Sequence, residues 1–217
     1  MNMRSKARLE KSKAHVAWNH ETKRVNDWLV ACVDAEQSPA ERRWLWELAR
    51  NVRPGGVWVE IGTKYGGSSR IVGTANPKMQ VYTVDTHNDK EWRKHGRKRQ
   101  SGYVKQLDGV NNVLPLTGVS SKMVPALAQL QGRARAEFDV VFIDGDHSYE
   151  GVVADIEAYM PYVRDGGMLC GHDYYREGDV YFGEFHGGMR RGVDEALARF
   201  GYRPFIYERI WYVVVQK

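Results

Sequence analysis

Several side chains that could do chemistry stand at or near the ends of apolar runs in this sequence. Glu60, Asp85 and Asp144 each occupy such a position, His147 follows three residues after Asp144, and Asp173 follows a later apolar run. A carboxylate is costly to bury, so one at the end of an apolar strand is a candidate ligand-binding or catalytic group. Carboxylates can hold an ammonium, a ribose or a divalent cation, and a histidine can exchange a proton near neutral pH.

A glycine-rich turn follows Glu60 and indicates what kind of ligand could bind there. Residues 57–61 predict a short buried strand, and Gly62, Gly66 and Gly67 predict a tight turn into a helix. Such a turn lets the backbone approach a ligand, and the helix start offers N–H groups to a carboxylate or phosphate. An acid about 20 residues downstream, here Asp85, is placed to bind ribose hydroxyls. The combination predicts a cofactor that contains adenosine, without saying which one.

The elements that position these residues alternate from residue 57 onward. Strand-like runs cover 57–61, 80–85, 112–116, 138–143 and 167–171, and helices are expected at 67–75, 98–108, 121–131 and 149–163. This alternation predicts an α/β fold in which helices cover both faces of a parallel sheet.

The end of the chain departs from that alternation. A helix is expected over 191–200, and strands over 202–207 and 210–215 with only Glu208 and Arg209 between them. So short a connection requires antiparallel pairing. The result is a Rossmann-like three-layer sandwich whose seven-stranded, mostly parallel sheet has a reversed last strand.

The first 50 residues predict a helical extension to this domain. Ser38, Pro39 and Glu41 form the start signal of a helix, with a capping serine, an early proline and a glutamate three residues later. At 217 residues the chain suits a single domain, so we expect an N-terminal extension over 1–50 and the main domain over 51–217. Four tryptophans offer a surface for a homodimer: Trp18, Trp28, Trp44 and Trp46.

Composition excludes several other classes of protein. With 42% apolar residues and no apolar run of membrane-spanning length, we expect a cytoplasmic globular protein without a signal peptide or membrane partner. Two cysteines, Cys32 and Cys170, are too few for a disulfide framework. The net charge of +5 includes basic runs over 4–13 and 93–99. These runs could meet nucleic acid, but a solvated loop or lid is the simpler interpretation.

Two longer blocks make the chain resemble the class I S-adenosylmethionine-dependent methyltransferases. They are the glycine turn with its preceding acid, and residues 138–151 (FDVVFIDGDHSYEG) followed by 166–174 (GGMLCGHDY). The resemblance covers roughly residues 50–217. It is closest to the small, often metal-dependent O-methyltransferases related to the catechol, caffeoyl-CoA and macrolide-sugar enzymes, and it implies a small-molecule acceptor.

The resemblance implies a set of cofactor contacts on this chain. Glu60 would hold the methionine ammonium, Ser68 and the amides near Gly66 its carboxylate, and Asp85 the ribose. Ser120 falls where the family holds the adenine. The full set is Glu60, Gly62, Thr63, Tyr65, Gly66, Gly67, Ser68, Asp85, Thr86, Ser120, Asp144 and Asp146.

The resemblance also implies the catalytic groups and a metal. His147 matches the family's catalytic lysine and is expected to deprotonate the acceptor hydroxyl, with Asp144 beside it. Asp144 matches the first acid of a Mg²⁺ site, Asp173 a second, and His172 is a rival for the third place because the family's Asp-Asn pair is absent. An imidazole ligand would favour Mn²⁺, Fe²⁺ or Zn²⁺ over Mg²⁺.

Two segments are expected to border the acceptor. Residues 89–103 could form a lid, and the long loop expected over 174–189 could form a wall.

The alternative functions are those of a nucleic-acid methyltransferase, a dinucleotide-dependent oxidoreductase, a metal-dependent hydroxylase-related enzyme, and a domain without turnover. The glycine pattern departs from G-x-G-x-x-G, which disfavours the oxidoreductase.

Overall fold

The computed structural model describes residues 21–31, 33, 35–86, 106–175 and 184–217. The expected lid over 89–103, the basic runs over 4–13 and 93–99, most of the helix expected over 98–108, and Trp18 lie outside these residues. None of the described helices is long and apolar enough to cross a membrane.

A seven-stranded sheet forms the centre of the molecule, in the order β3-β2-β1-β4-β5-β7-β6. Only β7 runs against its neighbours, β5 and β6, so the predicted sheet with one reversed strand is confirmed. The strands are β1 (Val57–Ile61), β2 (Gln80–Asp85), β3 (Val113–Thr117), β4 (Phe138–Ile143), β5 (Val163–Gly171), β6 (Phe205–Tyr207) and β7 (Ile210–Val214).

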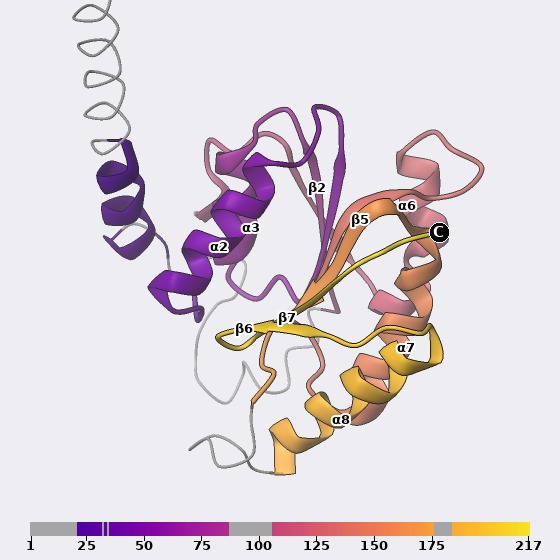
Figure 1. Cartoon of the computed structure of the whole chain (residues 1–217). Coiled ribbons are helices and arrows are strands. Elements are labelled where there is room, and N and C mark those ends of the chain that lie inside the picture. Colours follow the sequence, from indigo (N-terminus) through magenta and orange to yellow (C-terminus); the bar gives the residue numbers. More distant parts are fainter. Residues whose placement is uncertain (1–20, 32, 34, 87–105, 176–183) are drawn as a thin grey trace, which may run out of the picture.

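Helices cover both faces of this sheet (Figure 1). One layer holds the helix over residues 21–31, α2 (Pro39–Arg50) and α3 (Gly67–Ala75). The other holds α6 (Val124–Leu130), α7 (Tyr149–Tyr159) and α8 (Glu184–Arg199), with 3-10 turns η1 (Ser120–Lys122) and η2 (Met160–Tyr162). Strand β1 shows how the layers arise, because Val57, Val59 and Ile61 face the second layer while Trp58 and Glu60 face the first.

Helix α2 begins as its sequence predicted. The Ser38 hydroxyl accepts a hydrogen bond from the backbone N–H of Glu41, and the Glu41 carboxylate accepts one from the N–H of Ser38. Leu45 and Ala49 of this helix are buried in the same core cluster as Ile71 of α3. The division into an extension over 1–50 and a domain over 51–217 stays a prediction.

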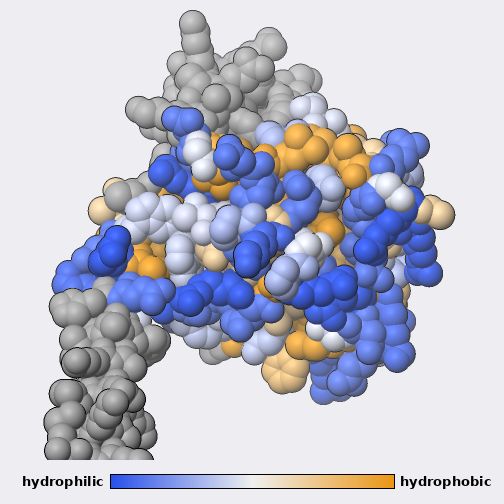
Figure 2. Space-filling view, turned by 90° about the horizontal axis from the view of Figure 1, so that it is seen from above, coloured by the Kyte–Doolittle hydropathy of each residue, from blue (hydrophilic) through white to orange (hydrophobic). Residues whose placement is uncertain are grey.

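The tryptophans of this layer pack on the protein itself. The Trp28 and Trp46 rings lie 5.5 Å apart, and Trp44 lies 5.6 Å from Tyr212 of β7. Figure 2 shows mostly hydrophilic side chains on the face seen from above, with hydrophobic groups scattered among them. Each of these three rings thus packs against another aromatic ring of the same chain. The homodimer stays a prediction.

The loop expected over 174–189 from its Gly, Tyr, Phe and His residues is wrong at its end, because α8 already begins at Glu184, while 176–183 lie outside the described residues. Two glycines of α8 serve helix packing. A side-chain carbon on Gly192 would lie 2.4 Å from Val152 of α7, and one on Gly188 would lie 3.2 Å from the Tyr149 nitrogen. Small residues therefore let α7 and α8 approach closely, and a pattern typical of a loop is a helix here.

Candidate active site

The candidate cofactor turn lies between β1 and α3. Gly66 has a left-handed backbone (φ 79°) and caps α3 without a side-chain hydrogen bond, so the first turn keeps its N–H groups for another acceptor. Gly62 (φ 92°) has the turn conformation expected of a glycine, and it also leaves no room for a side chain, because a side-chain carbon there would lie 1.9 Å from the backbone oxygen of Asp144. Its small size brings the cofactor turn against the end of β4.

Glu60 is the most deeply buried acid of this turn. One carboxylate oxygen accepts a hydrogen bond of 2.7 Å from the Ser68 hydroxyl, and the other has no partner among the described residues. Burial raises the pKa of Glu60 from 4.5 to about 8, although the nearby Ser68 and Ser69 hydroxyls oppose this. The buried Ser69 hydroxyl lies beside Glu60 but makes no aligned hydrogen bond with the described residues. These orphaned atoms fit a ligand that carries a cationic donor group.

The remaining predicted cofactor residues divide into two groups. Asp85 stands at the end of β2 beside the turn, where one of its oxygens accepts the Lys64 N–H at 3.1 Å. The Thr63 and Ser120 hydroxyls are engaged inside the protein, with Thr83 at 2.6 Å and with Asp155 at 2.5 Å. Direct side-chain contact with a cofactor therefore stays a prediction for both.

Asp146 and Thr86 are the exposed members of the predicted set, and one oxygen of Asp146 accepts the Ser148 N–H that precedes α7. Tyr65 contributes its backbone oxygen to Gln106 at 3.1 Å. Cofactor contacts for Asp146, Tyr65 and Thr86 stay predictions.

The second half of the site is formed by the ends of β4 and β5, which lie side by side in the sheet. Asp144, His147 and Asp173 each bring one potential ligand atom into a group whose members all lie within 4.8 Å of one another. His147 Nε2 lies 3.1 Å from Asp173 Oδ2 and 3.9 Å from Asp144 Oδ1. Asp173 has a left-handed backbone (φ 59°), a strained conformation that costs about 1–3 kcal/mol and is common at active sites.

His172, the third metal ligand suggested by the sequence, lies between two carboxylates instead. Its Nδ1 lies 3.1 Å from Asp173, and its Nε2 lies 3.2 Å from Glu41, an ion-pair distance without hydrogen-bond alignment. Burial alone would lower the pKa of His172, but the carboxylates of Asp144, Asp173 and Glu41 raise it to about 10. A doubly protonated ring cannot bind a metal, so the geometry favours His147 over His172 as a neighbour of a cation.

The two acids of the cluster differ in their electrostatics. The pKa of Asp173 falls to about 2, because the hydrogen bond and charge of His172 outweigh burial. Burial raises the pKa of Asp144, and the charge of Asp173 adds to this effect. Asp173 is therefore the permanent carboxylate, and Asp144 takes up a proton more readily.

Three further residues of the site were missed at the level of sequence. Glu41 is fully buried, and it accepts hydrogen bonds from Arg209 at 2.7 and 3.1 Å in addition to capping α2. Gln37 donates a hydrogen bond of 2.8 Å to Asp144 Oδ2. The only visible signal was the capping motif of Glu41, since contacts across more than 100 residues leave no local pattern.

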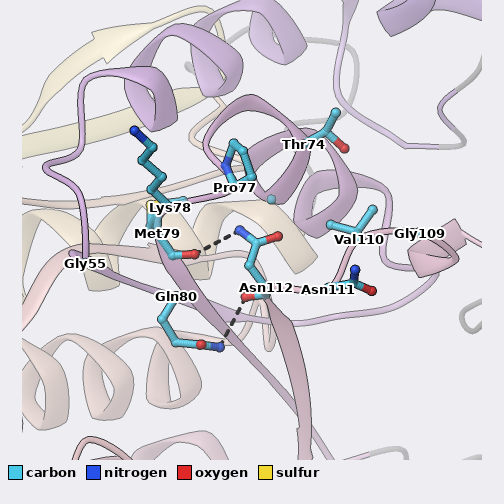
Figure 3. Close-up of a pocket in the computed structure, with 11 residues that line it drawn as sticks. Gly55, Thr74, Pro77, Lys78, Met79, Gln80, Gly109, Val110, Asn111 and Asn112 are labelled. Carbon is cyan, nitrogen blue, oxygen red and sulfur yellow. Dashed lines mark hydrogen bonds between the residues drawn. The ribbon is translucent and has the colours of Figure 1, made fainter.

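A separate hollow lies elsewhere in the described part of the chain. It encloses about 720 Å³ and is lined by residues that precede β1, β2 and β3, among them Gly55, Lys78 and Asn112 (Figure 3). These strands begin there, so the hollow is at the opposite edge of the sheet from Asp85, Asp144 and Asp173. The Asn112 amide already donates to the Asn76 and Met79 carbonyls, and we assign the hollow no chemistry.

Comparison with known proteins identifies a common architecture. The family described as "Methyltransferase domain" matches residues 59–174. The O-methyltransferase TomG from Streptomyces achromogenes, solved with S-adenosylmethionine, is 21% identical, with a TM-score of 0.62 over 85% of this chain and 83% of that one. An O-methyltransferase from Bacillus cereus, solved with S-adenosylhomocysteine, is 22% identical, with a TM-score of 0.57 over 90% of each chain. At these identities the likeness establishes the fold.

One relative is similar in sequence over a short stretch. An uncharacterized protein, R132, of Acanthamoeba polyphaga mimivirus is 47% identical over 36 residues, which are 17% of this chain and 16% of that protein. So short a match adds nothing about activity.

Replacing Glu41 tests whether its buried charge holds the site together. We expect Glu41→Gln to lower the free energy of unfolding by about 3–5 kcal/mol at pH 7, because Arg209 and His172 would lose their shared carboxylate. The measurement is urea unfolding followed by circular dichroism. The matched control is Glu47→Gln on the same helix, where an exposed ion pair with Arg43 contributes less than about 1 kcal/mol. Equal losses in the two variants would refute the role.

The raised pKa of Glu60 predicts how stability changes with pH. A carboxyl that binds its proton more tightly when folded contributes its full stability below pH 4.5 and loses it as the pH rises to about 8. Without cofactor, the protein should therefore lose about 2 kcal/mol more between pH 6 and 9 than Glu60→Gln does. Urea unfolding at both pH values measures this, with Glu150→Gln at an exposed site as control. A Glu60→Gln variant with unchanged pH dependence would contradict the prediction.

Proposed function

We propose, on the premise that this chain belongs to the methyltransferase-domain family, that it transfers a methyl group from S-adenosylmethionine to a hydroxyl of a small molecule. The observation that carries the proposal is the Glu60 carboxylate, buried at the glycine turn with one oxygen unpartnered among the described residues. Solved proteins of this fold are described in complex with S-adenosylmethionine or S-adenosylhomocysteine, which supports the choice of cofactor.

The cofactor's polar groups match the residues around the turn. Glu60 would bind the ammonium, the N–H groups at the start of α3 the carboxylate, and Asp85 the ribose hydroxyls. S-adenosylmethionine, when bound, supplies a methyl group on a positively charged sulfur that leaves as a neutral thioether. Burial of Glu60 keeps water from competing for the ammonium, so the residue both binds and orients the methyl donor.

The acceptor hydroxyl would lie beside His147. Asp173 Oδ2 lies 3.1 Å from His147 Nε2 and can orient the ring and stabilise it once it is charged. His147 then takes the hydroxyl proton, and the two strand ends hold the acceptor oxygen close to the methyl donor. Asp144 and Asp173 have the oxygen donors of a divalent-cation site. A cation there would make the acceptor hydroxyl more acidic.

Calorimetric titration with S-adenosylhomocysteine tests the cofactor. We expect binding to the unaltered protein, no binding of NAD, and at least about 10-fold weaker binding to Asp85→Ala, because hydrogen bonds to a charged group contribute about 1.5–3 kcal/mol. Asp108→Ala, at an exposed position, is the control that should bind normally. If the unaltered protein ignores S-adenosylhomocysteine, the proposed function is wrong.

Replacing His147 tests the proton transfer. On the first hydroxylated acceptor found by screening phenols, catechols and sugar derivatives with labelled S-adenosylmethionine, His147→Ala should lower kcat by about 10²–10⁴-fold while cofactor binding is kept. The kcat of His147→Ala should rise at higher pH, because the acceptor hydroxyl then ionises without a base. Tyr149→Phe is the control, since that hydroxyl bonds Glu195 of α8. Unchanged turnover in His147→Ala would exclude a general base at this position.

A further inference from the structure

We infer that Gln37 supplies an amide oxygen to a divalent-cation site shared with Asp144 and Asp173, which leaves His147 for proton transfer. The inference deepens the proposed function and rests on it. It concerns a residue that precedes α2, outside the segment that matches the methyltransferase family.

Gln37 is a buried polar side chain with half of its hydrogen-bonding capacity unused. Only 5% of the residue is exposed, its Nε2 donates to Asp144 Oδ2 at 2.8 Å, and its Oε1 is buried without a partner among the described residues. An unsatisfied buried acceptor costs about 1–3 kcal/mol. The amide therefore has no second hydrogen bond from the described residues that would hold it in this orientation.

Hydrogen bonds hold the backbone at and directly after Gln37. The Gln37 carbonyl accepts a hydrogen bond of 2.8 Å from Arg42 Nε. On either side, Glu36 forms an ion pair with Lys64 of the cofactor turn and Ser38 caps α2. Such support is what a preorganised ligand needs, because little conformational freedom remains to be lost on binding.

The distance between Gln37 and Asp144 suits neighbouring ligands of one cation. A half-turn of the amide exchanges its nitrogen and oxygen, which would place Oε1 where Nε2 now lies, 2.8 Å from Asp144 Oδ2. Ligands at about 2.1 Å from a cation and at right angles to each other are roughly 3 Å apart. Asp144, Asp173 and an amide oxygen form an all-oxygen set, which suits Mg²⁺ or Mn²⁺.

The two histidines are the competing candidates for this place. Both nitrogens of the His172 ring face carboxylates, those of Glu41 and Asp173, so each already lies against a group that competes with a cation for it. His147 Nε2 lies 3.1 Å from Asp173 and could bind the same cation. A metal-bound ring could not also accept the acceptor's proton, so the two assignments exclude each other and predict different variants to fail.

A titration of the protein with Mn²⁺, followed by the paramagnetic resonance of the free ion, separates these assignments without an acceptor. We expect Gln37→Leu to weaken Mn²⁺ binding about 10-fold or more, as loss of a ligand or its support does. Gln37→Glu should restore or tighten binding, since it keeps the oxygen and adds charge. His147→Ala should bind Mn²⁺ within about 3-fold of the unaltered protein. Gln129→Leu, the same change at an exposed position, is the control.

Several outcomes would overturn the inference. The first is that the unaltered protein does not bind Mn²⁺, and the second is that Gln37→Leu binds it normally. If Gln37→Glu fails as badly as Gln37→Leu, Gln37 acts as an N–H donor to Asp144 rather than as a ligand. If His147→Ala alone loses the ion, the ligand is the imidazole. Calorimetry with S-adenosylhomocysteine on each variant reports folding, and it shows whether the proposed function fails separately.

Discussion

A carboxylate that is removed from water must be neutralised, and at Glu41 that constraint joins three separate parts of the chain. The groups that neutralise it are Arg209 from the β6–β7 turn, His172 from the end of β5, and the N–H of Ser38 at the start of α2. An uncompensated buried charge costs several kcal/mol, so none of these elements can move away alone. The first layer of helices is thereby fixed to the edge of the sheet where the candidate catalytic groups lie.

From Glu41 inward, carboxylates and imidazole rings alternate. The His172 ring lies between Glu41 and Asp173, and Asp173 in turn lies between His172 and His147. This order explains how several carboxylates can lie together at the ends of β4 and β5 despite their mutual repulsion. It also makes the acids unequal, because Asp173 has the nearest cation and Asp144 is more affected by burial.

The sequence predicted the features that depend on a local pattern, and it did not predict those that depend on contacts between distant residues. Alternating strands, the two-residue turn at Glu208 and Arg209, and the capping motif at Ser38 are local, and each is found as expected. The resemblance to methyltransferases is likewise confirmed by the family match. Gln37 and Arg209 reach the site only through folding. The end of the loop expected over 174–189 was wrong in part because a glycine that permits helix packing, such as Gly188, looks the same in a sequence as one that makes a loop.

The contact between Gly62 and the Asp144 backbone has a consequence for how such an enzyme could diversify. Where the two strands β1 and β4 meet, main chain touches main chain, so the spacing between the candidate cofactor turn and the candidate catalytic groups does not depend on any side chain that could be exchanged. Segments outside the sheet could then change shape while the distance between these two candidate sites stays constant. Different parts of one small fold would thus determine the choice of acceptor and the distance of transfer.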